Sequence, residues 1–258
     1  MRLNVKNIFG AGLIALAFSV GTAKIAAAQS CTVPPTCDAL GYTKSATDCK
    51  DMSTLKCPFD QSKVFCVTAA EVPGGNCEVG AILYSDKSCN VNVVAGKIAI
   101  GVVFDSTNSL AVALKNSSTM YWSTDYFDIP DLPNLTSTAV AIADWNGKNN
   151  TKTIMDYCKA NSKSCPAAEY ASKYTTTGTA AGDWYLPAAG ELNAIYNAKA
   201  AINATMAKVG GTALAESWHW SSSEYNGYGA WVQGFGNGGV YDSSKAGSSD
   251  YGRPVLAF

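Results

Sequence analysis

Few side chains in this sequence of 258 residues have the chemistry of a catalytic group. His219 is the only histidine, so a serine–histidine–aspartate triad would have to use it. It stands between Trp218 and Trp220, and a histidine with aromatic neighbours on both sides is more often part of a core. Glu224 could act as a general acid, but a lone carboxylate without a second partner is weak evidence for that role. We therefore predict no catalytic residue, no enzyme activity and no cofactor.

Three carboxylates are the candidate metal ligands. Asp125, Asp128 and Asp131 follow one another at three-residue spacing, beside Pro130 and Pro133. Hard oxygen ligands of this kind could hold a structural calcium ion. A solvated acidic loop explains the same residues and is the favoured interpretation, so no metal site is predicted.

The nine cysteines stand at positions 31, 37, 49, 57, 66, 77, 89, 158 and 165. No C-x-x-C pair is present, so a zinc–thiolate site is disfavoured, and disulfides are expected if the chain is exported. Cys77 and Cys89 flank a predicted strand and are expected to pair. Cys158 and Cys165 lie across the end of a predicted helix and form the second expected pair. The odd thiol then falls in the amino-terminal module, where it could link the protein to a surface partner.

The carboxy-terminal segment has the composition of a recognition surface. From Ser222 to Gly252 there are eight Gly, six Ser, four Tyr, two Asn and two Asp, which fill 22 of 31 positions. Tyr gives large, rigid contacts, and Ser, Gly and Asn give adaptable hydrogen bonds, as in antibody paratopes. Hairpin turns need the same small residues, so a set of β-hairpins without a ligand is the alternative. The predicted ligand-binding residues are Asn226, Tyr228, Val232, Gly234, Gly236, Val240, Tyr241, Asp242, Ser243, Ser244, Ala246, Ser248, Ser249, Asp250 and Tyr251.

Larger residues that interrupt this segment are predicted to form its buried frame. Within Ala230–Gly236 larger residues alternate with smaller ones, and a strand would place the two sets on opposite faces. The set expected to face the core is Trp231, Gln233 and Phe235, and the set expected to face outward includes Val232, Gly234 and Gly236.

The first 28 residues are typical of a secretory signal peptide. Arg2 and Lys6 precede an uncharged apolar run from Ile8 to Val20, and three alanines at 26–28 suit cleavage before Gln29. The run is shorter than the roughly 20 residues of a membrane span, so no integral membrane segment is predicted. We expect the protein to be secreted, periplasmic or attached to a bacterial surface.

The remaining sequence divides into a small module, a linker and one large domain. Residues 29–70 are rich in cysteine and too few for a large core, so disulfides must stabilise them. Residues 71–76 (EVPGGN) are a predicted linker, and 77–258 form the main domain. Without the signal peptide the formal charge becomes −4, because three of the 19 basic residues lie in it. No cluster of Lys and Arg is left, so no nucleic-acid partner is predicted.

The main domain is predicted to be α+β. Short apolar runs bounded by turn residues predict strands at Val79–Tyr84, Lys97–Phe104 and Ser109–Leu114. Thr151–Ala160 predicts a short helix. Apolar residues at three-, four- and seven-residue steps predict one long helix over Ala188–Val209, before short strands return.

Four motifs follow in order: GDWYLPAAGEL (182–192), WSSSEY (220–225), AW-x-Q-x-F-x-N-G (230–238) and RPVLAF (253–258). Together they resemble bacterial C-type-lectin-like domains of the formylglycine-generating-enzyme type, which include the carboxy-terminal domain of a collagen-like adhesin. The resemblance covers residues 77–258. It implies a fold of small antiparallel sheets with one or two helices.

The same resemblance implies ligand binding rather than catalysis. The related oxidase needs a late cysteine pair, and no cysteine follows Cys165 here. Some relatives are variable proteins, in which a diversity-generating retroelement mutates Asn-type codons near the carboxy-terminus. Such codons cannot become Trp, Gln, Lys, Glu or Met. In Asn226–Gly252 only Trp231, Gln233 and Lys245 belong to that excluded class.

We therefore expect an exported ligand-binding or adhesion protein that displays a variable surface rich in Tyr, Ser and Gly. Its ligand would be a protein or a glycan. One alternative is a structural or pilus-like component of a surface assembly. A less favoured alternative is an enzyme on the formylglycine-generating-enzyme fold.

Overall fold

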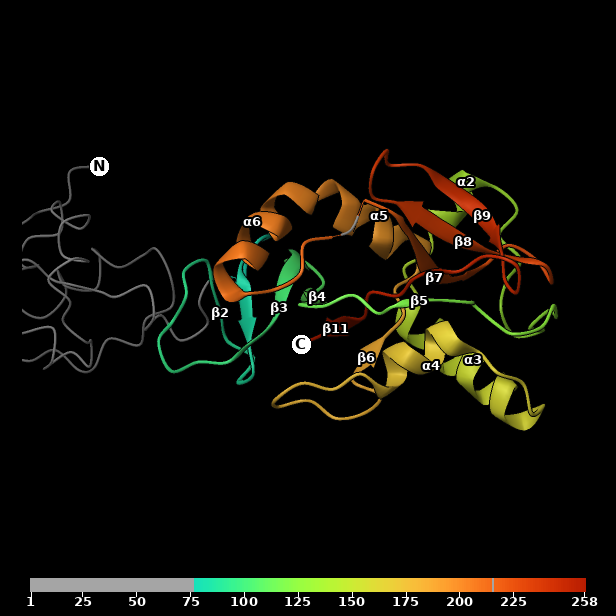
Figure 1. Ribbon diagram of the computed structural model, residues 1–258, viewed down its shortest axis with the longest axis horizontal. Coiled ribbons are helices and arrows are strands. Elements are labelled where there is room, and N and C mark those ends of the chain that lie inside the picture. Colours follow the sequence, from blue (N-terminus) through green and yellow to red (C-terminus); the bar gives the residue numbers. More distant parts are fainter. Residues whose placement is uncertain (1–76, 215) are drawn as a thin grey trace, which may run out of the picture. The chain divides into compact units, whose positions relative to one another are not determined.

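The computed structural model describes residues 77–214 and 216–258, which form an α+β domain (Figure 1). The predicted signal peptide, Cys-rich module and linker all lie in residues 1–76, outside the described residues. The predicted position of the odd thiol lies there too. In the described part, two β-sheets carry five helices.

The first sheet has six strands, each antiparallel to its neighbours. The strands are β1 (Ile82–Tyr84), β2 (Cys89–Asn90), β3 (Ala99–Asp105), β4 (Leu110–Ala113), β6 (Trp184–Tyr185) and β11 (Val255–Ala257). Their order across the sheet is β2-β1-β3-β4-β11-β6. The three strands that the sequence predicts first correspond to β1, β3 and β4. The last strand, β11, comes from the RPVLAF motif and pairs with both β4 and β6, so residues far apart in sequence complete one sheet.

Two helices cover one face of this sheet, α5 (Ala189–Asn197) and α6 (Lys199–Val209). Their apolar side chains pack with the strands in one buried cluster, which includes Val102, Val112, Leu192, Ile195, Ile202, Met206 and Val255. The opposite face of the sheet is also buried, around Trp184. The six-stranded sheet therefore forms the rigid base of the domain.

The prediction of one helix over Ala188–Val209 is wrong at Ala198. That residue has φ −91° and ψ 2°, outside the α-helical range, and it ends α5 and begins α6. Ile195 and Ile202, on either side of the break, still join the same buried cluster. The apolar periodicity thus continues through a change of direction, which is why the pattern alone does not reveal the break.

The second sheet has five strands and contains most of the predicted recognition segment. Its strands are β5 (Thr119–Met120), β7 (Trp218–Glu224), β8 (Gly229–Gly234), β9 (Val240–Ser244) and β10 (Asp250–Tyr251). The order is β5-β10-β7-β8-β9, and only the β10–β7 pair is parallel. Helices α3 (Gly147–Ala160) and α4 (Pro166–Lys173), yellow in Figure 1, lie beneath β7.

Both faces of β8 are buried, so the prediction that Val232 and Gly234 face outward is wrong. Val232 packs into the cluster formed with α3 and α4, and Trp231, on the opposite face, packs against α5 and α2 (Thr138–Ala141). A Cβ at position 234 would lie 2.8 Å from the Trp218 ring, so this position has no open space. The alternation in the sequence is real, but helices cover both sides of the strand.

Both disulfides predicted in the main domain are present, Cys77–Cys89 and Cys158–Cys165. The first joins the start of the domain to β2. The second spans the turn between α3 and α4, and its sulfurs lie in the cluster beneath the five-stranded sheet. The short predicted helix Thr151–Ala160 corresponds to α3, which begins four residues earlier. Helices α2 and α4 lie outside the predicted helices.

The Arg253 guanidinium lies fully buried where the chain passes from β10 to β11. Its Nε donates to the Ala113 carbonyl at 2.8 Å, Nη1 donates to Asn116 Oδ1 at 2.6 Å, and Nη2 donates to the Thr212 carbonyl at 2.9 Å. Burial lowers its pKa to about 10. These bonds tie the end of the five-stranded sheet to β4 of the six-stranded sheet.

Candidate recognition site

A cavity of about 270 Å³ opens at the turn between β7 and β8. Four predicted ligand-binding residues line it, Asn226, Tyr228, Asp242 and Ser244, together with Gly229 and Tyr126. The β-ladder explains this meeting, because Gly229 at the start of β8 pairs with Ser244 at the end of β9. Residues from the turn and from the neighbouring strand therefore face one hollow.

Tyr126 belongs to the cavity but not to the predicted set. It lies in the loop after β5, and its ring centre is 5.7 Å from that of Tyr228, at an interplanar angle of 47°. Its hydroxyl hydrogen-bonds the Ser244 hydroxyl at 2.9 Å. Both tyrosines are exposed, at 52% for Tyr126 and 72% for Tyr228. Nothing in the local sequence around Tyr126 predicts this role. Tyr126 and Tyr228 are more than 100 residues apart in the sequence, and only the fold brings their rings together.

Some polar groups of the cavity have hydrogen-bond partners among the described residues, and one carboxylate does not. Asn226 Oδ1 accepts hydrogen bonds from the backbone N–H groups of Tyr228 and Gly229, which fixes the turn. Ser244 Oγ accepts from the Gly247 N–H at 3.1 Å. The exposed Asp242 carboxylate has no hydrogen bond or ion pair with any other described residue. It is thus the open charged group of the cavity.

A fully buried ion pair between Lys245 and Glu224 adjoins this cavity, because Lys245 follows Ser244 and its N–H donates to the Tyr228 carbonyl. Lys245 Nζ also donates to the Phe127 carbonyl at 2.8 Å and lies 4.6 Å from the centre of the Trp122 ring. Glu224 Oε2 accepts from the Ile129 N–H at 3.4 Å. Burial raises the pKa of Glu224 and lowers that of Lys245, while the pairing acts in the opposite direction on each. The Glu224 carboxyl is therefore enclosed, in contrast to the open position expected of a general acid.

The other predicted ligand-binding residues do not share one face with this cavity. The Tyr241 ring packs edge-on against Trp218, at 5.5 Å, and the half-buried Tyr251 stacks on His219, also at 5.5 Å. Gly236 follows the far end of β8 and is exposed. Ser243 Oγ donates to Asp250. The remaining four, Val240, Ala246, Ser248 and Ser249, are half-buried or exposed. The predicted surface is thus a set of separate patches.

His219 is a core residue. Its ring is completely buried between Phe235, at 4.4 Å, and Tyr251, and burial lowers its pKa to about 3. Nδ1 lies 3.2 Å from the Ser217 carbonyl, so the neutral ring donates through Nδ1. Nε2 has no hydrogen-bond partner within the described part of the chain. No serine hydroxyl is hydrogen-bonded to His219 there, and the arrangement of a triad is not present in these residues.

The serines of the WSSSEY motif serve the frame rather than the surface. Ser221, Ser222 and Ser223 are all buried. Ser223 Oγ donates to Asp144 Oδ2 at 2.6 Å and accepts from the Ala189 N–H at 2.9 Å. These bonds join the WSSSEY strand to the start of α5, in the GDWYLPAAGEL motif.

Glu191 fixes the same helix start from the other side. Its Oε2 accepts from the Ala188 N–H at 2.7 Å, and its Oε1 accepts from the Tyr185 hydroxyl at 3.2 Å. A Cβ at position 147 would lie 2.1 Å from Oε2, so only the glycine found there leaves room for the carboxyl. Burial raises the pKa of Glu191 to about 8, although its two hydrogen bonds oppose the shift.

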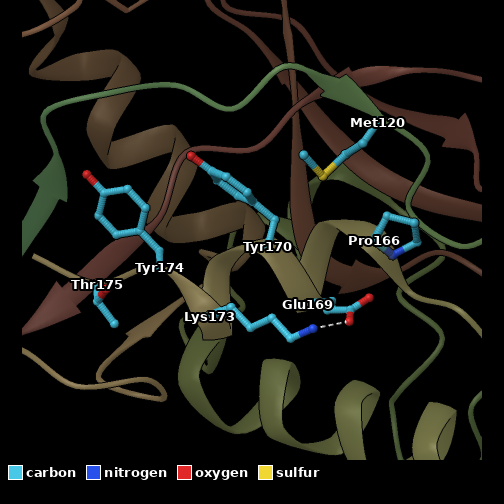
Figure 2. Close-up of a pocket in the computed structure, with 7 residues that line it drawn as sticks. All are labelled: Met120, Pro166, Glu169, Tyr170, Lys173, Tyr174 and Thr175. Carbon is cyan, nitrogen blue, oxygen red and sulfur yellow. Dashed lines mark hydrogen bonds and ion pairs between the residues drawn. The ribbon is translucent and has the colours of Figure 1, made fainter.

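A second cavity, of about 530 Å³, lies along α4 (Figure 2). Tyr170 and Tyr174, one turn apart, line it together with Met120 of β5, and the Lys173–Glu169 ion pair lies at its side. None of the predicted ligand-binding residues lines this cavity. Burial raises the pKa of both tyrosine hydroxyls above the ordinary value.

The acidic loop is tied to neighbouring side chains. Asp125 pairs with Lys163 at 3.0 Å, and Asp128 Oδ1 accepts from Asn134 Nδ2 at 2.9 Å. Within residues 77–214 and 216–258, no three or more His, Cys, Asp or Glu residues are grouped so that they could hold a metal ion. Nor does a helix in that part have the length and apolar character to span a bilayer.

Comparison with known proteins gives a likeness in fold. No family model matches the chain, and no curated protein matches it. Among solved structures it resembles a fimbrial protein from Bacteroides ovatus, with a TM-score of 0.57 and 16% sequence identity. The match covers 70% of this chain and 49% of that chain, so this chain corresponds to about half of the fimbrial protein. At this identity the likeness concerns the fold alone.

We predict that replacing Glu191 with Gln removes a pH dependence of stability. The folded-state pKa, about 8, lies above the ordinary value of 4.5, so the folded state holds a proton that the unfolded state has lost. The stabilisation that comes from this bound proton is fully present below pH 4.5. As the pH rises above 4.5, the free energy of unfolding should fall by about 1.4 kcal/mol per pH unit until the folded-state pKa is reached. Urea unfolding at several pH values, relative to the E191Q variant, measures the slope. The control variant E169Q retains Glu191 and should keep the wild-type slope, and equal slopes for wild type and E191Q would contradict the prediction.

We also predict that Lys245→Met lowers the free energy of unfolding by about 3–5 kcal/mol, because it leaves the Glu224 carboxyl buried without its partner. The double variant E224L/K245M should lose less than K245M alone, since it removes both buried charges. Denaturant titration gives both values. Lys152→Met, in the exposed pair with Asp156, is the control and should change stability by under about 1 kcal/mol. A K245M loss no larger than that of the control would show that the buried pair is not needed.

Proposed function

We propose that this chain is an exported component of a fimbria-like bacterial surface assembly, and that its carboxy-terminal domain presents a recognition surface to a ligand. The likeness in fold to the Bacteroides ovatus fimbrial protein, over 70% of this chain, is the observation that carries the assembly part. Two disulfides in the described residues agree with an oxidising compartment outside the cytoplasm.

The proposal of a recognition surface is supported by the contrast between exposed tyrosines and the buried strands β7 and β8. Tyr126, Tyr228 and Tyr241 are exposed, and they are held by the Tyr126–Tyr228 ring contact, the Tyr126–Ser244 hydrogen bond and the packing of Tyr241 on the half-buried Trp218. Tyrosine is enriched at binding hot spots, because it offers a large contact area at low cost in conformational entropy. Within this proposal the domain is C-type-lectin-like, of the formylglycine-generating-enzyme type, and binds rather than catalyses.

Assembly is tested by shearing filaments from bacteria that make the protein and separating them by sedimentation. We expect the protein to sediment with the filaments, and antibodies against it to label them in electron micrographs. Non-reducing electrophoresis of the same material would reveal a disulfide link to another component through the odd cysteine. A clean monomer in the secreted fraction, with unlabelled filaments, would instead identify a free-standing receptor.

The proposal that the carboxy-terminal segment is diversified is supported by the positions of the residue types that mutated Asn-type codons cannot encode. Trp231, Gln233 and Lys245, the three residues between 226 and 252 that Asn-type codons cannot become, are all buried, with 3% exposure at most. A retroelement mechanism would leave such frame positions unchanged while exposed turns vary. We expect the neighbouring DNA to contain a near-copy of this coding segment beside a reverse transcriptase gene. If neither is found, the retroelement mechanism is wrong and the proposed assembly function is unaffected.

A further inference from the structure

We infer that the cavity between Tyr126 and Tyr228 binds an alkylammonium group, which a ligand carries as a lysine side chain or a choline-type headgroup. This inference rests on the proposed recognition function and names the chemistry of its ligand. The structure offers two features suited to a cation, aromatic rings and an unpaired carboxylate, in one small hollow.

The two tyrosine rings form the aromatic part of the cavity. Their centres are 5.7 Å apart and their planes are inclined by 47°, so they form a corner rather than a stack. The face of an aromatic ring is negatively polarised and attracts ammonium cations within about 6 Å of its centre. The hydroxyl of Tyr126 is held by Ser244 Oγ, which keeps that ring in place before any ligand arrives.

Asp242 supplies the charge. It lines the cavity from β9, two residues before Ser244, the ladder partner of Gly229, and a Cβ at Gly229 would be 3.5 Å from its Oδ2. Each of the described ion pairs uses other carboxylates, so the Asp242 carboxylate is open to a ligand. The nearby cation Lys245 is buried and already paired with Glu224.

A second carboxylate adds to this negative environment. Asp128 packs against the cavity turn, because a Cβ at Gly227 would lie 3.6 Å from the Asp128 Cβ. Its Oδ1 accepts a hydrogen bond from the neutral Asn134 side chain, and its charge also acts on the buried pair, where it raises the pKa of both Glu224 and Lys245. Opposite charges attract strongly at such distances when partly shielded from water, so an anionic ligand is disfavoured here.

The size of the cavity limits what can enter. Its volume of about 270 Å³ is below the roughly 300–1,000 Å³ of typical small-molecule pockets, so it suits one terminal group of a larger ligand. A neutral sugar ring could also stack on a tyrosine. The uncompensated charge of Asp242 favours the cation, and the sugar is a separate outcome of the test.

The test is a titration of the isotopically labelled protein with four probes, followed through backbone amide signals in NMR spectra. The probes are tetramethylammonium, choline, Nα-acetyl-lysine methylamide and methyl glucoside. We expect the ammonium probes to shift the amides of Tyr228 and Gly229 and the glucoside to leave them unchanged. Affinity should fall several-fold when salt is raised from about 20 to about 500 mM, because exposed charges are screened. Stronger binding of choline or of the lysine probe identifies the source of the group.

Matched variants separate the contribution of the Asp242 charge from that of the tyrosine rings. Asp242→Asn and Tyr228→Ala should each weaken binding by about tenfold, as expected for loss of a charge or of a ring contact. Tyr126→Phe keeps the ring and should retain most of the affinity, whereas Tyr126→Ala should lose it. Asp131→Asn and Tyr121→Ala change an exposed carboxylate and an exposed ring outside the cavity and should have no effect.

Two results would overturn the inference. One is the absence of any shift with the three ammonium probes, and the other is binding of methyl glucoside that neither salt nor Asp242→Asn alters. The second result would assign the cavity to a neutral glycan. If the protein sediments with filaments while the titrations fail, the proposed assembly stands and only the cation site is wrong.

Discussion

The ion pair between Lys245 and Glu224 is the contact on which the candidate site depends. Glu224 ends β7, and Lys245 follows directly after β9. The Lys245 backbone donates to the Tyr228 carbonyl and accepts from the Trp122 and Ser123 N–H groups, so one residue joins the hairpin turn to the loop that carries Tyr126. Removal of two charges from water is costly, and such a pair persists where its geometry and hydrogen bonds are complete. Here they are, because Phe127 and Ile129 satisfy the remaining polar atoms.

The frame around this pair is polar as well as apolar. Ser223 and Asp144 hold the start of α5 against β7, and Arg253 holds β10 against β4. These three are hydrogen-bonded to backbone groups from distant parts of the chain, whereas Glu191 bonds within the start of α5 and to Tyr185 of β6. Buried polar groups of this kind are favourable only when all their partners are in place, so they specify one arrangement of the two sheets. The turns at the surface can then differ in sequence without disturbing that arrangement.

Much of the fold follows from sequence patterns, because burial leaves a periodic trace. The apolar runs identify β1, β3 and β4, and the positions of four cysteines beside a predicted strand and a predicted helix identify both described disulfides. The patterns fail where the fold covers a face that the sequence alternation predicts to be exposed. Val232 has the alternation of a surface position, but α3 and α4 cover the face on which it lies. Helix α4 is only eight residues long and its buried residues are three alanines, so no large apolar side chain marks its buried face in the sequence.

The candidate site was only partly predictable for a related reason. Asn226, Tyr228, Asp242 and Ser244 have the residue types of a binding surface, and the cavity does unite them. Tyr126 has no such signal, and the spread of Tyr241 and Tyr251 to other ring partners depends on the strand order. Composition describes what a segment can contact. Only the topology decides which of its residues meet.

The position of β11 also has a consequence for how the protein is made. This strand lies between β4 and β6, so the six-stranded sheet lacks an interior member until residue 257 has been synthesised. Pairing of such distant segments is slow, because a long loop must close before its contacts form. A growing chain therefore cannot complete this sheet before residue 257 has been synthesised. For a chain that is exported as proposed above, that delay would favour passage through a channel that accepts unfolded polypeptide, with closure of the sheet left to the far side of the membrane.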